Sequence, residues 1–450
     1  MLLGLLRNAK RDVIDDRLHR ILAALHPPTF DRGKCDLLNC LRPLFSTELE
    51  AKAVALKILN LRAAERHFHH RSATLRSRPV ALVVDPSNAC QLGCPGCVHS
   101  PGMKSAFDWQ PGMLAHHRFS AFLERYGPTA THLSLYNYGE PVLNRSTPAY
   151  IRLAKRYLLQ TILSTSLSVR HFDADAYVES GLDYMIVSID GATQPVYEQF
   201  RRRGNLELAL TNLQALVEAK RRYGRDTPVV VWRYLMFRHN RHQVPLAAAM
   251  AEDMGVDEFR AQPGWDVSWD EPGIETTDAE SVRYAFDDVF AAVAGNWNPF
   301  PNELAAAAID RAFDESWNTV EEPGSQRSAG PSPEPACEWL YKNLTMDAGG
   351  RILPCCCSPR RDGELVFAQF DGIQDSDTFN SEKFQAARQL FAGQPEPAVS
   401  QGVFCAQCEF DKSSDPSTEQ LRNYFWAASI FAKRGCLGER SLNELCSWRN

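Results

Sequence analysis

Three cysteines within eight residues constrain this chain more than any other feature. Cys90, Cys94 and Cys97 lie in the segment NACQLGCPGC, directly after an apolar run, 80–84, that predicts a buried strand. Three thiolates in one loop can hold an iron–sulfur cluster and leave one of its irons open. A structural zinc site needs four ligands and usually collects them as two spaced pairs, so a compact triplet suits zinc poorly. The loop therefore predicts a cluster whose open iron can bind a substrate or a cofactor.

The composition predicts a globular enzyme of two or three domains. The chain has 450 residues, 44% of them hydrophobic, and its 49 basic and 55 acidic side chains give a formal net charge of −6. No basic block is present that would recruit nucleic acid or an anionic membrane, and no apolar run is long enough for a transmembrane helix. The thirteen cysteines cluster at ligand-like spacings. They favour metal binding in a reducing cytoplasm over disulfide bonds.

The middle of the chain alternates between strand-like and helix-like segments. Between two consecutive strands, for example, residues 206–223 carry leucines at helical spacing. This alternation is typical of a parallel sheet covered by helices, and six units are fewer than the eight of a closed barrel. The predicted strands are residues 80–84, 131–136, 160–163, 184–189, 229–234 and 257–261.

The CxxxCxxC spacing of the cysteine loop, placed after the first strand, resembles the radical S-adenosylmethionine (radical SAM) superfamily. The resemblance implies an α/β fold, a partial (β/α)6 TIM-like barrel over residues 79–264. It also implies that Cys90, Cys94 and Cys97 hold a SAM-binding 4Fe-4S cluster, reduced by a donor such as flavodoxin or ferredoxin, and act as the catalytic centre. The sequence departs from the family at Gly96, where an aromatic residue is common.

A second motif follows the second predicted strand and contains Gly139 and Glu140, just before Pro141. It resembles the glycine–glutamate motif of the family, which implies that these two residues receive the methionyl ammonium of SAM. A glycine allows close backbone approach, and a carboxylate is a charge-assisted acceptor for an ammonium. The alternative is a simple turn before the proline, and the position after the cysteine loop favours the motif.

Short polar residues follow the third and fourth predicted strands. The run Ser164-Thr165-Ser166 follows the third, and Ser188 and Asp190 lie in the sequence SIDGAT after the fourth. The resemblance implies that they bind the ribose and the methionyl carboxylate of SAM, although such residues also cap helices. Arg201 is either the partner of the SAM carboxylate or one member of a solvated arginine cluster, 201–203.

Four further cysteines, past a linker rich in proline and serine, predict a second metal site. Their spacing resembles the SPASM domain and its shortened form, the twitch domain, and implies one auxiliary 4Fe-4S cluster. A zinc ion on the same thiolates is the alternative. The predicted ligands are Cys337, Cys355, Cys405 and Cys408.

Two adjacent cysteines, Cys356 and Cys357, leave the assignment of Cys355 open. Either could replace Cys355 as a ligand, or could stand free near the active site as a hydrogen-atom donor. The oligomeric state is not predicted.

The sequence divides into five predicted segments. A helical extension, whose role the sequence does not predict, precedes the barrel. A helical segment with the linker, the auxiliary-cluster domain and a helical tail follow it. Their bounds are residues 1–78, 79–264, 265–335, 336–410 and 411–450.

The assembled prediction is an enzyme that cleaves SAM reductively to a 5′-deoxyadenosyl radical. The radical then abstracts hydrogen from a small polar metabolite, for oxidation or epimerisation. One alternative is a peptide-modifying maturase of the same superfamily, in which crosslinking is a further possible outcome. A second alternative, from a different class, is a non-catalytic scaffold that binds zinc or a cluster. The ordered polar motifs on the expected active face weigh against the scaffold.

Overall fold

The computed structural model describes most of the barrel and part of the C-terminal region. Predictions for residues 1–47, 287–336 and 409–450, and for Cys357, lie outside the described residues. The described residues are 48–101, 111–264, 274–286, 337–356, 366–372, 377–395 and 402–408.

Six parallel strands form the centre of the molecule, and they pair in chain order. All five pairings between consecutive strands are parallel, as between Val83 of β1 and Ser134 of β2. This arrangement confirms the predicted (β/α)6 half-barrel. The strands are β1 (Ala81–Val84), β2 (His132–Ser134), β3 (Gln160–Thr165), β4 (Tyr184–Ser188), β5 (Val229–Met236) and β6 (Glu258–Pro263).

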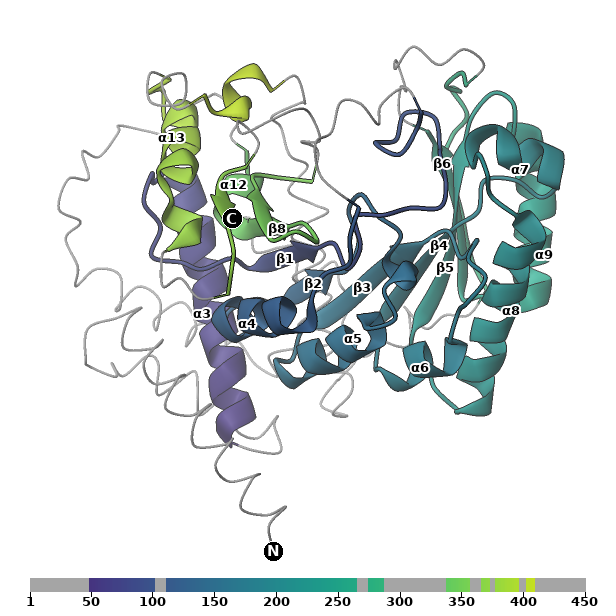
Figure 1. The fold of residues 1–450 in the computed structure, drawn as a ribbon, viewed down its shortest axis with the longest axis horizontal. Helices are drawn as coiled ribbons and strands as arrows, with labels where there is room; N and C mark the ends of the chain where they lie inside the picture. The colour runs from purple at the N-terminus through teal and green to yellow at the C-terminus, as the bar shows by residue number, and fades with distance from the viewer. Residues whose placement is uncertain are drawn as a thin grey trace, which may run out of the picture.

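Helices connect these strands and cover the outer face of the curved sheet (Figure 1). In α8, the Asn205 side chain caps the first turn by accepting from the amide of Leu208, and Leu213 and Leu216 face the core. Gly255 ends α9 in a left-handed conformation that suits glycine. The helices are α4 (His116–Tyr126), α5 (Thr147–Arg156), α6 (Ala174–Glu179), α7 (Gln194–Phe200), α8 (Leu206–Arg222) and α9 (Val244–Met254).

The C-terminal region continues the same sheet on the other side of β1. Strand β8 (Asn343–Met346) pairs parallel with β1, and β9 (Arg351–Leu353) and β10 (Ala368–Gln369) follow it in antiparallel pairs. At the far edge, β7 (Val282–Ala285) pairs antiparallel with β6. The sheet therefore has ten described strands, and the predicted auxiliary-cluster region is joined to the barrel by backbone hydrogen bonds.

Helix α3 (Glu48–His69) packs against this junction, beside α12 (Trp339–Lys342). Lys57 of α3 is buried and donates to the carbonyl oxygen of Gly127, 2.7 Å away. Among the described residues, no helix is long and apolar enough to cross a membrane. The remaining helical elements are η3 (Pro141–Leu143), η4 (Arg241–Gln243), η5 (Thr378–Asn380), α13 (Glu382–Phe391) and η6 (Phe404–Gln407).

The two faces of the central strands have different surroundings, because successive side chains of a strand alternate between faces. Leu163, Met185 and Trp232 point outward and belong to the apolar core beneath the helices. Ser164 and Arg233 lie on the opposite, inner face and are only partly buried. The inner face of the half-barrel is therefore polar where β3 and β5 pass the site described next.

Candidate active site

The cysteine loop begins five residues after Asp85, at the carboxyl end of β1. A turn brings the amide of Cys97 to the carbonyl oxygen of Cys94, at 3.1 Å. Gly96 has a φ of 71°, in the left-handed region that favours glycine. The glycine that departs from the family pattern therefore allows the chain to turn between the second and third cysteines.

The three thiols lie in a buried environment and influence one another. Burial raises the pKa of all three. It raises that of Cys97 to about 11, with the neighbouring Cys94 adding to the shift. Glu140 raises the pKa of Cys90 further, whereas Arg201 opposes the shift at Cys94. Soft sulfur donors shielded from water fit an iron–sulfur cluster, which binds cysteine as thiolate.

The three sulfurs of the loop are fewer than the four ligands of a structural zinc site. Within the described residues, which include all seven predicted cysteine ligands, no three side chains of His, Cys, Asp or Glu are grouped closely enough to hold one ion. A zinc site requires four ligands around one centre, whereas each thiolate of a 4Fe-4S cluster binds a different iron. The donor set of the loop therefore fits a cluster better than zinc.

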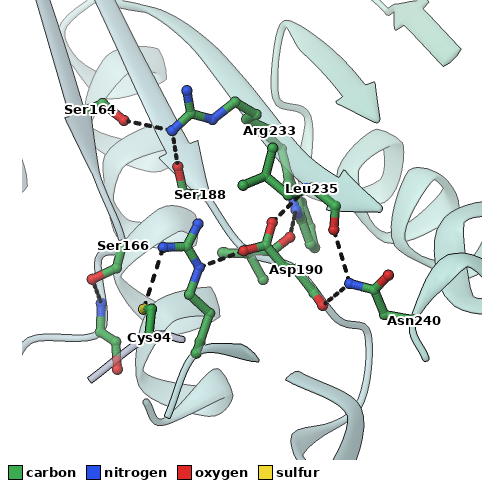
Figure 2. A network of polar contacts seen from close by, with 12 residues as sticks. Cys94, Ser164, Ser166, Ser188, Asp190, Arg233, Leu235 and Asn240 are labelled. Atoms are coloured by element: carbon green, nitrogen blue, oxygen red, sulfur yellow. Dashed lines mark hydrogen bonds and ion pairs between the residues drawn. The ribbon is translucent and has the colours of Figure 1, made fainter. Parts of the chain in front are cut away.

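Arg201 lies beside the cysteine loop in a buried ion pair. Its Nε is 2.5 Å from Oδ2 of Asp190, and its Nη1 is 3.8 Å from Sγ of Cys94. The Arg201 side chain is 13% exposed, so the solvated interpretation of this residue is wrong. Asp190 also accepts from the amide of Leu235 at 2.6 Å, as Figure 2 shows. Asp190 thus anchors Arg201 to β5 and orients it toward Cys94.

The two arginines that follow also hold the cysteine loop. The Arg203 guanidinium donates to the carbonyl oxygen of Leu92, and the Arg202 carbonyl oxygen accepts from the amide of Gly93 at 3.1 Å. The segment after α7 therefore fixes the loop from one side.

Gly139 lies against the backbone just before the cysteines. A Cβ atom on this residue would lie 1.6 Å from the carbonyl oxygen of Ser87, so no larger residue fits without movement. The next amide, that of Glu140, donates to the carbonyl oxygen of Ala89 at 2.8 Å. The predicted glycine–glutamate motif is therefore in direct contact with the cysteine loop.

The Glu140 carboxylate is buried, with 3% of the residue exposed, and is held by the end of β3. It accepts from Oγ1 of Thr165 at 2.6 Å, and from the amide and the hydroxyl of Ser166 at 2.9 and 2.7 Å. The structure thus brings together two predicted residues, Glu140 and Thr165. Ser166 belongs to the same run of polar residues, Ser164-Thr165-Ser166, that the sequence places after the third strand.

Asp85 is a residue of this site that sequence analysis missed. Its carboxylate accepts from the amides of Tyr138 at 3.0 Å and Gly139 at 3.4 Å, and so holds the glycine–glutamate loop to the end of β1. Burial raises the pKa of Asp85 to about 7 against the backbone hydrogen bonds that lower it, and Asp347 adds to the rise. An acidic residue directly after a buried strand was the available signal.

Arg233 of β5 is the second missed residue, and two predicted residues converge on it. Its Nη2 donates to Oγ of Ser188 at 2.9 Å and to Oγ of Ser164 at 3.3 Å (Figure 2). A charged residue within the otherwise apolar run VVVWRYLM was the signal. The strand ends therefore form two polar groups, one around Asp190 and one around Arg233.

The four predicted ligands of the auxiliary cluster lie in separate short elements. Cys337 precedes α12, Cys355 follows β9, Cys405 lies in η6 and Cys408 ends it. The auxiliary cluster itself stays a prediction.

Cys356 lies close to the glycine–glutamate loop. The Tyr138 hydroxyl donates to its carbonyl oxygen at 2.6 Å, and His99, just past the cysteine loop, contacts the carbonyl oxygen of Tyr138 at 2.9 Å. The chain of contacts joins the cysteine loop, the glycine–glutamate loop and the C-terminal cysteine run.

Comparison with known proteins gives matches among solved structures only. No family model matches the chain, and no curated protein does. The structure of Streptococcus suis SuiB bound to the precursor peptide SuiA matches at 12% identity and a TM-score of 0.43, over 76% of this chain and 72% of SuiB. BtrN in complex with AdoMet and 2-DOIA matches at 13% identity and a TM-score of 0.37, over 74% of this chain and 93% of BtrN.

A further match is native anSMEcpe with bound AdoMet, at 12% identity and a TM-score of 0.40, over 79% of this chain and 97% of that one. These matches are to radical SAM enzymes, the superfamily that the cysteine loop resembles. At these identities and TM-scores the matches carry no argument about the function of this chain.

Proposed function

We propose that this chain is a radical SAM enzyme acting on a small polar metabolite. Cys90, Cys94 and Cys97 would hold a 4Fe-4S cluster, and Cys337, Cys355, Cys405 and Cys408 an auxiliary one. The first cluster, when bound and reduced by a flavodoxin- or ferredoxin-type donor, supplies the electron that splits SAM and yields the hydrogen-abstracting radical. Oxidation or epimerisation is the proposed outcome for the substrate.

One observation carries this proposal: the contact between the glycine–glutamate loop and the cysteine loop. Gly139 touches the backbone of Ser87, and the amide of Glu140 binds Ala89, one residue before the first cysteine. A ligand that bridges the two loops would meet thiolates on one side and a carboxylate on the other. SAM, which carries a sulfonium, an ammonium and a carboxylate, suits such a site.

The residues around this contact orient the groups that would receive SAM. Thr165 and Ser166 fix the Glu140 carboxylate, whose negative charge suits the methionyl ammonium. Asp190 holds Arg201 beside Cys94, where a cation stabilises a thiolate. Burial of these groups excludes water, which strengthens each electrostatic contact.

The inner face of the half-barrel supports a polar substrate. Ser164, Ser188 and Arg233 present hydroxyl and guanidinium groups beside the proposed SAM site. A purely apolar ligand would leave the buried Nε of Arg233 without a partner, at a cost of about 1–3 kcal/mol for an unsatisfied group.

The proposal is tested by anaerobic reconstitution with iron and sulfide, followed by SAM and dithionite. We expect about eight irons per chain, and 5′-deoxyadenosine as a product detected by mass spectrometry. Cys94→Ala should abolish 5′-deoxyadenosine formation. Cys446→Ser, at a position without ligand-like spacing in the sequence, is the matched control and should retain it. Bound zinc without SAM cleavage would contradict the proposal.

A further inference from the structure

Arg233 lies in a row of polar residues that crosses four strands on the inner face. In the parallel register, Ser188 of β4 pairs with Arg233 of β5, and Arg233 pairs with Arg260 of β6. Register partners in adjacent strands point to the same face of a sheet. Arg283 of β7 pairs with Arg260 and continues the row. Three arginine residues therefore occupy register positions on the same face of β5, β6 and β7.

The row carries more positive than negative charge. Arg260 and Arg283 share one buried carboxylate, that of Glu258, with Arg283 at 2.9 Å. Within the part of the chain that the structure describes, no carboxylate forms an ion pair with Arg233. Its hydrogen-bond partners there are Ser164 and Ser188.

The hydrogen bonds of Arg233 leave donors available for a ligand. Both serine oxygens accept from the guanidinium, so the hydrogen of each hydroxyl is left to donate elsewhere. The Nε of Arg233 is buried and has no hydrogen-bond partner among the described residues. Burying a charged group costs free energy unless the group is paired. Burial accordingly disfavours the charged guanidinium and lowers the pKa of Arg233. An anion placed here would meet the guanidinium and both hydroxyls.

We infer that Arg233, Ser164 and Ser188 bind a carboxylate or phosphate group of the substrate. This inference rests on the proposed function and names its substrate class, an anionic metabolite. A guanidinium presents its donors in a planar fork that matches carboxylate and phosphate, so arginine suits such a group better than lysine. Ser164 and Ser188, which the sequence predicted as SAM contacts, serve the anionic group of the substrate in this assignment.

Arg233 and Arg201 have different hydrogen-bond partners. Arg201 is already neutralised by Asp190 beside Cys94, and Figure 2 shows Arg233 turned toward Ser164 and Ser188 instead. The Glu140 carboxylate lies in the glycine–glutamate loop and accepts a hydrogen bond from Thr165. SAM and an anionic substrate would therefore use different cations of the same half-barrel.

The inference is tested on the reconstituted, unreduced holoenzyme saturated with SAM, with inorganic phosphate and acetate as the probes. Isothermal titration should detect binding of at least one probe. Arg233→Met should weaken this binding at least tenfold. Arg233→Lys keeps the charge but loses the planar fork of donors, so its affinity for the probe should lie between those of the wild type and of Arg233→Met. Arg238→Met removes the same charge from an exposed ion pair with Glu275 and should leave binding unchanged.

Three results would overturn the inference. In the first, neither probe binds the SAM-loaded wild type. In the second, Arg233→Met binds the probes as tightly as wild type. In the third, Arg233→Met weakens SAM binding tenfold, which would assign the anion to the carboxylate of SAM itself. Retained iron content and circular dichroism show that the variant folds. The 5′-deoxyadenosine assay reports on the proposed function separately, because it needs no anionic substrate.

Discussion

The Asp190–Arg201 ion pair allows a quantitative test of how the site is held together. Asp190 is fully buried and Arg201 nearly so, with 2.5 Å between the carboxylate and Nε. Removing one partner of a buried pair leaves an uncompensated charge, which costs about 3–5 kcal/mol. Asp190→Asn should therefore lower the free energy of unfolding by this amount, even though asparagine can still accept from the amide of Leu235.

The double variant separates the ion pair from other effects. Arg201→Met alone leaves the Asp190 carboxylate buried without its cation, so a similar loss is expected. Asp190→Asn combined with Arg201→Met removes both charges together. The double variant should be more stable than the sum of the two losses predicts, by about 2 kcal/mol, within the coupling range for contacting residues.

Urea unfolding of the cluster-free protein, followed by circular dichroism, measures these free energies. Asp175→Asn is the matched control, because Asp175 forms an exposed pair with Arg222 and should change stability by less than about 1 kcal/mol. If the two single losses add in the double variant to within about 0.5 kcal/mol, the pair is not coupled and the reasoning is refuted.

Two further predictions concern the glycine–glutamate loop. Because the folded pKa of Asp85 is raised to about 7 from the ordinary 3.8, its ionisation opposes folding. Stability should fall as pH rises from about 4 to about 7 and level off above, by up to ~4 kcal/mol. Asp85→Asn should flatten this dependence in urea titrations, and an unchanged slope would contradict it. Gly139→Ala should cost about 1–3 kcal/mol by overpacking against Ser87 and weaken SAM binding in calorimetry. Wild-type affinity in this variant would show that the loop does not touch SAM.

Local pattern was sufficient to predict the barrel strands. The apolar run 229–234 predicted β5, observed as Val229–Met236, because a strand buried on both faces needs a continuous apolar sequence. Residues 206–223 likewise predicted α8 from leucines at helical spacing. These signals are carried by neighbouring residues, so they can be read without the tertiary structure.

Pairings between distant segments could not be predicted in this way. Strand β8 lies beside β1, although more than 250 residues separate Ala81 from Asn343 in the sequence. Nothing in the local pattern of residues 343–346 specifies this neighbour. The described part of residues 265–335, predicted as a helical segment and a linker rich in proline and serine, contains the edge strand β7, whose place is set by its pairing with β6.

In the candidate site, too, local motifs could be predicted from the sequence, whereas contacts between distant segments could not. The motifs predicted Gly139 and Glu140, and the structure places both against the cysteine loop. The partners of these residues depend on which strand ends meet. Asp85 and Arg233 were missed for this reason, since each acts through contacts with another strand or loop.

Electron paramagnetic resonance of the reduced, reconstituted protein tests the central claim most directly, with SAM absent and then present. The account predicts the signal of a reduced 4Fe-4S cluster, and a change in that signal when SAM binds its open iron. The signal of this cluster should be absent from Cys90→Ala, Cys94→Ala and Cys97→Ala. A protein that gives no cluster signal, or a signal that SAM leaves unchanged, would contradict the claim that these three cysteines form a SAM-binding site.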